Sequence, residues 1–328
     1  MDTRLNVADL NAIETRVAAW IAGCEPLLQV FYEGKDPYLA FAVKMYGIPY
    51  ETLEADLHSD DPVKKAAAKF MRQMAKPGVL AAVYRQGAGG MGKDKKTGDP
   101  KKLGLWGYAE NMGIDMTLAE AQNITNVFRE SYPEIVHMWY ALEIAIKSVL
   151  QNRPVTTTNP DMLFSLSRLD QIGIKFDKLP FNDRGNDRQI LRMQLPSGRY
   201  LHYVDAHIDD IRMPWSTEDN EVFKPGLIYS GVDQETKQWK NGIVSHGGKV
   251  FENAVQAIAR DVLCDKLLEI DQICSICGHV HDEGISETDN DPFHPGYREM
   301  VHLMSQPVRW APDLPLGADG FEDVYYHK

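Results

Sequence analysis

The sequence lacks long hydrophobic runs and has few cysteines. No stretch of about 18 or more apolar residues occurs, so no membrane-spanning helix is predicted. The first ten residues do not combine a basic segment with an apolar one, as a secretion signal does. Cys24, Cys264, Cys274 and Cys277 are too few and too scattered for a disulfide framework. We therefore expect reduced thiols and a cytoplasmic protein, in the host cytoplasm if the chain is viral.

An excess of positive charge is also missing. The 47 acidic and 35 basic residues give a formal net charge of −12, whereas proteins that grip nucleic acid usually show a basic footprint. Any hold on a nucleic acid is therefore expected to be weak or to be borrowed from another chain. The share of apolar residues, 44%, is typical of a globular protein, and 328 residues suggest about two structural units.

Hydrophobic periodicity divides the chain into four segments. A short strand and a helix make the first, mostly helical sequence the second, and short strands with turns the third. The fourth begins with an amphipathic helix at Lys249–Ile270 and continues into a hairpin that bends at His281-Asp282. The predicted boundaries are 1–28, 29–151, 152–245 and 246–328. This pattern predicts an α+β fold.

Local signals refine the helical segment. Asp61-Pro62 and the capping box from Thr117 to Glu120 predict helix starts. The glycine- and lysine-rich stretch 87–102 predicts a mobile basic loop. Pro77-Gly78 falls inside an expected helix, where proline removes a backbone donor and costs about 3 kcal/mol. We predict a kink or break there.

Two acidic sites lie where strands are expected to end. Asp9 closes the first strand, and Asp282-Glu283 lies at the tip of the late hairpin. An isolated aspartate at a strand end more often caps a turn. Phosphoryl transfer with two magnesium ions, however, needs carboxylates from different elements to converge. A sheet that places a strand end beside a hairpin tip meets that need.

Several motifs, in order, resemble family A DNA polymerases of the phage type. The segment Asp9 to Arg16 is similar to D-x-S-x-I-E-x-R, and Val280 to Glu283 is similar to V-H-D-E. Arg72 to Tyr84 resembles R-x-x-x-K-x-x-x-F-x-x-x-Y, with leucine at the aromatic position. The stretches 195–199, 253–261 and 310–322 also look phage-type, so the resemblance spans almost the whole chain.

The resemblance implies a catalytic centre that uses two Mg²⁺ ions. Asp9 and Asp282 would be metal ligands, together with the backbone carbonyl of Leu10, and Glu283 would support the site without binding an ion. The enzyme would add deoxynucleotides to a primer 3′ end. Its substrates would be deoxynucleoside triphosphates and primer–template DNA.

The resemblance also assigns nucleotide-binding residues. Arg72 and Lys76 lie four residues apart, which keeps both on one helix face, where they can pair with phosphate oxygens. A solvated basic face is the structural alternative. Leu80 would face the incoming sugar, Tyr84 would lie beside the templating base, and Glu14 would discriminate against ribose.

Three further residues would contact DNA by resemblance. Gln256 matches a glutamine at the primer–template minor groove, where base acceptors can be checked without reading sequence. His281 and Arg16 belong to the matching motifs at the hairpin and at the first aspartate.

In family terms, 1–28 and 246–328 would form an antiparallel palm sheet, 29–151 helical fingers and 152–245 a β-rich phage-type insertion. The family's thumb and exonuclease precede the first aspartate, before which only eight residues stand here. We therefore expect a second polymerase chain to supply the thumb and the rest of the palm.

Rival interpretations use the same residues differently. The chain could be a non-catalytic polymerase remnant that binds DNA or a replisome partner. A metal-dependent nuclease or deaminase could use the same carboxylates, but neither needs the Arg72 and Lys76 pair. A zinc site at Cys274, Cys277 and the nearby histidines is disfavoured, because no second CxxC follows.

Overall fold

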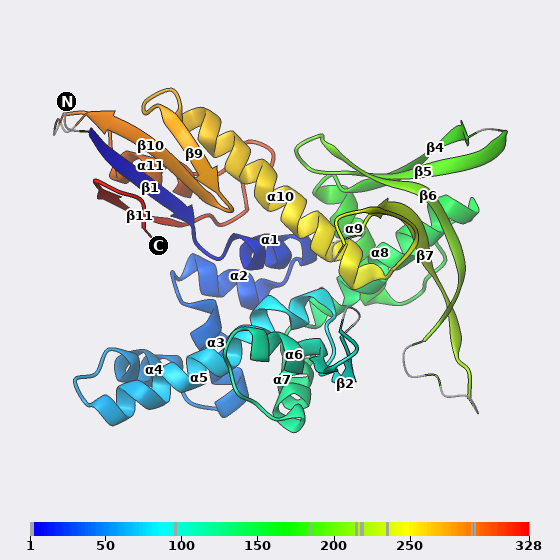
Figure 1. Cartoon of the computed structure of the whole chain (residues 1–328), viewed down its shortest axis with the longest axis horizontal. Coiled ribbons are helices and arrows are strands. Elements are labelled where there is room, and N and C mark those ends of the chain that lie inside the picture. Colours follow the sequence, from blue (N-terminus) through cyan, green and yellow to red (C-terminus); the bar gives the residue numbers. More distant parts are fainter. Residues whose placement is uncertain are drawn as a thin grey trace.

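The structure is a computed structural model that describes residues 3–94, 97–183, 185–213, 216, 220–233, 236–289, 291 and 293–327. Within these residues no helix is long and apolar enough to cross a membrane. The molecule combines helices with antiparallel sheets (Figure 1). The predicted α+β class is therefore confirmed.

The helices are concentrated between the first strand and residue 171, with two more near the end. Their bounds are α1 Ile13–Ala22, α2 Glu25–Tyr32, α3 Pro37–Tyr46, α4 Tyr50–Leu57, α5 Pro62–Leu80, the 3-10 turn η1 Ala82–Tyr84, α6 Gly104–Asn111, α7 Leu118–Ser131, α8 Pro133–Gln151, α9 Pro160–Gln171, α10 Gly247–Ile270 and α11 Tyr297–Ser305.

The strands form three antiparallel sheets. Their bounds are β1 Thr3–Leu10, β2 Gly90–Lys93, β3 Pro100–Leu103, β4 Lys175–Asp183, β5 Asn186–Gln194, β6 Tyr200–Arg212, β7 Phe223–Val232, β8 Trp239–Ser245, β9 Ile276–Val280, β10 Glu283–Asp289 and β11 Ala318–Asp323. Within the described residues the strand orders are β11-β1-β10-β9, β2-β3 and β4-β5-β6-β7-β8.

The four-stranded sheet joins the two ends of the sequence, because β1 pairs with both β10 and β11. Helices α10 and α11 pack against one of its faces (Figure 1). Glycine permits this close approach. A Cβ added at Gly284 would come within 2.9 Å of Leu267 on α10, and one at Gly320 within 2.8 Å of Val301 on α11. The other face carries Asp9.

The five-stranded sheet is attached to α10 by an ion pair as well as by packing. Arg199 and Ser197, in the turn between β5 and β6, both bond Asp261 of α10, at 2.7 and 2.5 Å. Arg199 also donates to the backbone carbonyl of Ala257 at 2.9 Å. Figure 1 shows α10 running from the four-stranded sheet to this second sheet. One helix therefore spans both regions.

Cap chemistry explains where several helices begin. The Asp61 carboxylate accepts from the backbone of Val63, so α5 starts at Pro62 as predicted. Thr117 and Glu120 form the predicted capping box of α7. Asp36 caps α3 in the same way as Asp61 caps α5, with proline at the next position.

The predicted kink or break at Pro77-Gly78 is not a break, since α5 continues to Leu80 with Pro77 inside it, and the kink stays a prediction. Tertiary packing offsets the lost backbone hydrogen bond. Pro77 and Gly78 are both buried, and a Cβ added at Gly78 would lie 2.3 Å from a ring carbon of Phe41 on α3. The C-terminal end of α5 is therefore held by packing against α3 and α7.

The predicted mobile loop at 87–102 is also wrong for the part that the structure describes. Residues Gly90–Lys93 and Pro100–Leu103 pair as a short hairpin, β2-β3. The hairpin is anchored by close backbone contacts between Gly89 and Leu103. Lys95 and Lys96 of the predicted loop lie outside the described residues.

Gly78→Ala should destabilise the fold by about 1–3 kcal/mol, because the added methyl overpacks the contact with Phe41. Chemical denaturation followed by circular dichroism measures the change in the free energy of unfolding. Gly87→Ala is the control, since a Cβ there meets nothing within 4 Å. Equal stability of the two variants would contradict the proposed packing constraint.

Candidate active site

The structure brings the two predicted acidic sites together at one end of the four-stranded sheet. In the antiparallel register of β1 and β10, Asp9 stands opposite Glu283. One step further, the backbone N–H of Leu10 donates to the carbonyl of Asp282 at 3.2 Å. His281, in the turn before β10, adopts a left-handed conformation with φ of 53°. Segments from opposite ends of the sequence thus meet at Asp9, Leu10 and Asp282.

The end of β1 is also held from its other side. Asp9 stands opposite Asp319 in the register of β1 and β11. Asn11 donates from its side chain to Asp319 at 2.9 Å and from its backbone to the Gly317 carbonyl at 2.9 Å. Residues that stand opposite each other in antiparallel strands share a sheet face. Asp9, Glu283 and Asp319 therefore lie side by side on one face.

The segment after β11 returns to that same face. The Tyr326 hydroxyl donates to the Glu283 carboxylate at 2.8 Å. Glu283 is only 3% exposed. The His327 ring stacks on Phe321 with centroids 4.4 Å apart, and Phe321 lies two positions from Asp319 on β11. Sequence reasoning missed Tyr326, because no local pattern signals a contact across the sheet.

The chemistry of these groups suits a magnesium ion. Mg²⁺ prefers oxygen ligands and is commonly held by one or two carboxylates, waters and substrate phosphates, without a complete protein cage. Asp9, Asp282 and the Leu10 carbonyl offer oxygen atoms. The described residues contain no group of three or more histidine, cysteine, aspartate or glutamate side chains placed to hold a metal. The donor set fits an ion whose shell is completed by substrate.

The helix face that carries Arg72 and Lys76 lies over the start of α3. Arg72 forms an ion pair with Asp36, with its Nη2 at 2.6 Å from the carboxylate. The Tyr38 ring lies beneath both cations, 5.2 Å from Arg72 Cζ and 5.8 Å from Lys76 Nζ. Burial, followed by repulsion from Arg72, lowers the pKa of Lys76. The sequence-based prediction named the two cations but neither Asp36 nor Tyr38.

Glu14 is surrounded by tyrosines from three other elements. Burial raises the pKa of Tyr38, to about 12, and that of Tyr84 and Tyr108, and the Glu14 carboxylate raises each of these further. Tyr84 is predicted to lie near Glu14, and the structure places them close enough to interact. No sequence motif predicts that Tyr38 and Tyr108 lie near Glu14.

Gln256 lies on α10 beside Tyr84. Gln256 is close enough to lower the pKa of Tyr84, which burial raises, and the Tyr84 ring packs against Phe251 with centroids 6.4 Å apart. Gln256 remains solvent-exposed on the polar stripe of α10. Leu80, at the last position of α5, is half-buried. The end of the motif from Arg72 to Tyr84 therefore contacts α10, the helix that carries Gln256.

Arg16 and His281 stand in different surroundings. The Arg16 guanidinium donates to the carbonyls of Asn11 and Pro315, at 2.7 and 3.2 Å, and lies 4.4 Å from the centre of the Phe31 ring. Burial lowers the pKa of Arg16 to about 10. His281 is exposed at the hairpin turn. Arg16 braces the segments around β1, and its contact with DNA stays a prediction.

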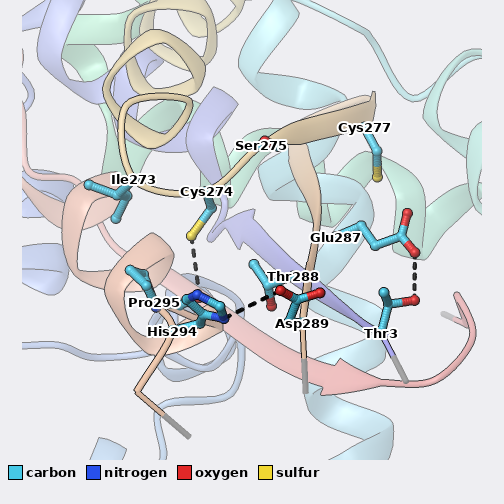
Figure 2. A pocket seen from close by; sticks show the side chains of 10 residues that line it. All are labelled: Thr3, Ile273, Cys274, Ser275, Cys277, Glu287, Thr288, Asp289, His294 and Pro295. Atoms are coloured by element: carbon cyan, nitrogen blue, oxygen red, sulfur yellow. Dashed lines mark hydrogen bonds and ion pairs between the residues drawn. The ribbon is translucent and has the colours of Figure 1, made fainter. Parts of the chain in front are cut away.

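A separate hollow of about 520 Å³ lies at the opposite end of the four-stranded sheet (Figure 2). Thr3 bonds Glu287 at 2.6 Å there, and His294 is 4.0 Å from Asp289. Cys274 and Cys277 also line it, and burial raises the pKa of Cys274. None of the predicted site residues lines this hollow. The carboxylate end of the sheet is the functional candidate.

No family model matches the chain. The sequence is nevertheless 31% identical, over 325 residues and 98% of its length, to a protein of Bacillus phage SP02. That relative is named DNA polymerase, and the chain spans 41% of it. The similarity bears out the resemblance to a phage DNA polymerase that the motifs indicate.

A solved structure also resembles the fold. It is the POL domain of Pol1 from M. smegmatis in complex with DNA primer-template and dNTP, at 13% identity and a TM-score of 0.47. The alignment covers 97% of this chain and 39% of that one.

Tyr326→Phe should lower the free energy of unfolding by about 1 kcal/mol, since buried Glu283 loses one hydrogen-bond donor. Urea denaturation measures it. Tyr325→Phe serves as the matched control, because Tyr325 is 63% exposed and its ring contact with His327 survives the change. If both variants were as stable as the parent, the bond across the sheet would not contribute.

Proposed function

We propose that this chain is the catalytic module of a template-directed DNA polymerase, which adds deoxynucleotides to a primer 3′ end. The observation that carries the proposal is the β1–β10 register, which sets Asp9 and Leu10 beside Asp282 and Glu283. The similarity to a phage DNA polymerase over 98% of the chain supports it independently. The segments 1–28 and 246–328 then serve as palm, 29–151 as fingers and 152–245 as insertion.

Asp9, Asp282 and the Leu10 carbonyl would hold two Mg²⁺ ions in this proposal. Bound there, the ions would stabilise charge on the attacking and leaving oxygens of the transferred phosphate. Glu283 would support the turn without binding an ion, and Tyr326 fixes its carboxylate by a 2.8 Å hydrogen bond. The protein's own cations and aromatic rings would bind the nucleotide and the DNA.

Arg72 and Lys76 would bind the triphosphate. Both project from α5 over the Tyr38 ring, so two positive charges are held at one place. Charge-assisted hydrogen bonds from such groups offset the charge that develops on phosphate oxygens as the bond to the leaving group breaks. Burial, followed by repulsion from Arg72, lowers the pKa of Lys76, and an anion between the two cations would relieve the repulsion.

Glu14, Tyr84 and Leu80 would surround the sugar and the templating base. The carboxylate of Glu14 in its cluster of tyrosines would disfavour a ribose 2′-hydroxyl, and aliphatic Leu80 would alter selectivity for sugar analogues. Gln256 would probe the minor groove of the primer–template, with His281 and Arg16 as further DNA contacts. The contact between Tyr84 and Phe251 of α10 would link the DNA and nucleotide sides.

A second polymerase chain that supplies a thumb and more of the palm is the proposed partner. Strands at the edge of a sheet offer unpaired backbone groups for such docking. Within the described residues, β9 and β11 are the edge strands of the four-stranded sheet. A non-catalytic remnant that binds DNA is the alternative function. The proposed place of action is the cytoplasm of the host.

Asp9→Asn and Asp282→Asn should each reduce nucleotide addition by more than about 100-fold, because each removes a charged metal ligand. Primer extension with Mg²⁺ and four deoxynucleotides measures this. Asp289→Asn, at the opposite end of the same sheet, is the matched control. Full activity of either Asp9→Asn or Asp282→Asn would overturn the assignment of the metal ligands.

A further inference from the structure

The carboxylate of Asp36 performs two separate tasks. One oxygen, Oδ1, caps α3 by accepting from the backbone N–H groups of Tyr38 and Leu39 at 2.8 and 3.0 Å. The other, Oδ2, accepts from Arg72 Nε at 2.7 Å and lies 2.6 Å from Arg72 Nη2 in the ion pair. The cap therefore fixes the orientation of the oxygen that Arg72 binds.

This geometry engages only one edge of the guanidinium. Arginine carries five N–H donors in a rigid planar fork. Asp36 takes the Nε donor and lies against Nη2, which leaves the Nη1 donors and the outward Nη2 donor. No other hydrogen-bond partner of Arg72 is present in the described part of the chain. The remaining edge is the bidentate fork that suits a phosphate.

Tyr38 completes the support. Its ring lies under the Arg72 guanidinium at 5.2 Å and under the Lys76 ammonium at 5.8 Å. The ring is partly buried, and its position is set by the same helix start that Asp36 caps. One short segment, Asp36 to Tyr38, thus contacts both cations of α5.

We propose that Asp36 and Tyr38 are positioning residues of the triphosphate site. Asp36 holds Arg72 by its side edge, so that the outer edge is presented to the phosphate, and Tyr38 supports both cations from below. This inference rests on the proposed polymerase function. It assigns to the start of α3 a part in nucleotide affinity that goes beyond holding the helix.

A purely structural role is a weaker explanation of the ion pair. Both side chains are 28% exposed, and ion pairs that water reaches add little to stability. The capping bonds would persist without the pair, because asparagine caps helices about as well as aspartate. Asp36→Asn therefore removes the charge and the grip on Arg72 while it keeps the cap.

The chain offers a matched control at Asp61. Asp61 also precedes a proline and caps its helix, accepting from Val63 at 2.9 Å, but it forms no ion pair in the described residues. Asp61→Asn thus changes the same chemical group in the same local setting. Any general effect of the substitution on a helix cap appears in both variants.

We expect Asp36→Asn to raise the KM for deoxynucleotides about five-fold while kcat changes less than about two-fold, since it loosens the hold on Arg72 without touching the reacting atoms. Asp61→Asn should match the parent. In an Arg72→Ala background, Asp36→Asn should have no further effect on KM. Equilibrium binding of a Mg²⁺–deoxynucleotide complex to the primer–template-bound protein should weaken in parallel.

The results separate the inference from the function on which it rests. An unchanged or lowered KM in Asp36→Asn, an equal effect in Asp61→Asn, or a persisting effect in the Arg72→Ala background would overturn the positioning role while the polymerase remains active. A parent chain that neither extends primers nor binds the nucleotide complex would overturn both.

Discussion

The placement of the acidic residues depends on the antiparallel pairing of β1 with β10. Successive side chains of a strand point to opposite faces, so a shift by one residue would move Asp9 to the face that packs against α10 and α11. Pairing β1 with β10 costs conformational entropy, because the two strands come from opposite ends of the sequence and the whole segment between them must be closed. Glycine at 284 and 320 lets the two helices approach the sheet closely, and this packing stabilises the register.

A second constraint fixes the positively charged side chains of α5. The cations of α5 are held from α3, through Asp36 and Tyr38, while the carboxylates are held at the end of the four-stranded sheet. Tyr84 and Gln256 connect the two regions through α10. A chain with a net charge of −12 can thus present local positive charge where a triphosphate would bind.

The features predictable from sequence were those with local signals. The helix starts at Pro62 and Leu118 follow from capping chemistry, and the strand end at Asp9 and the hairpin tip at Asp282 follow from alternation and turn residues. Only the family resemblance predicts that Asp9 and Asp282 come together, because their separation in the sequence does not show that their strands pair.

The features missed or misjudged depend on distant contacts. The helix does not break at Pro77, where Pro77 and Gly78 are buried and Gly78 lies against Phe41. Asp36 and Tyr326 carry no pattern of their own, since their partners lie far along the sequence. The glycine- and lysine-rich stretch 87–102 suggests a mobile loop, whereas Gly89 allows the close backbone contact with Leu103 that a hairpin needs.

The most direct test of the central claim is incorporation of a single nucleotide opposite each of the four template bases, by the purified chain and again with the proteins encoded beside its gene. The structure and the family resemblance lead us to expect Mg²⁺-dependent addition of the nucleotide that complements the template, in at least one of the two settings. Addition that ignores the template, or no addition in either setting, would contradict the claim.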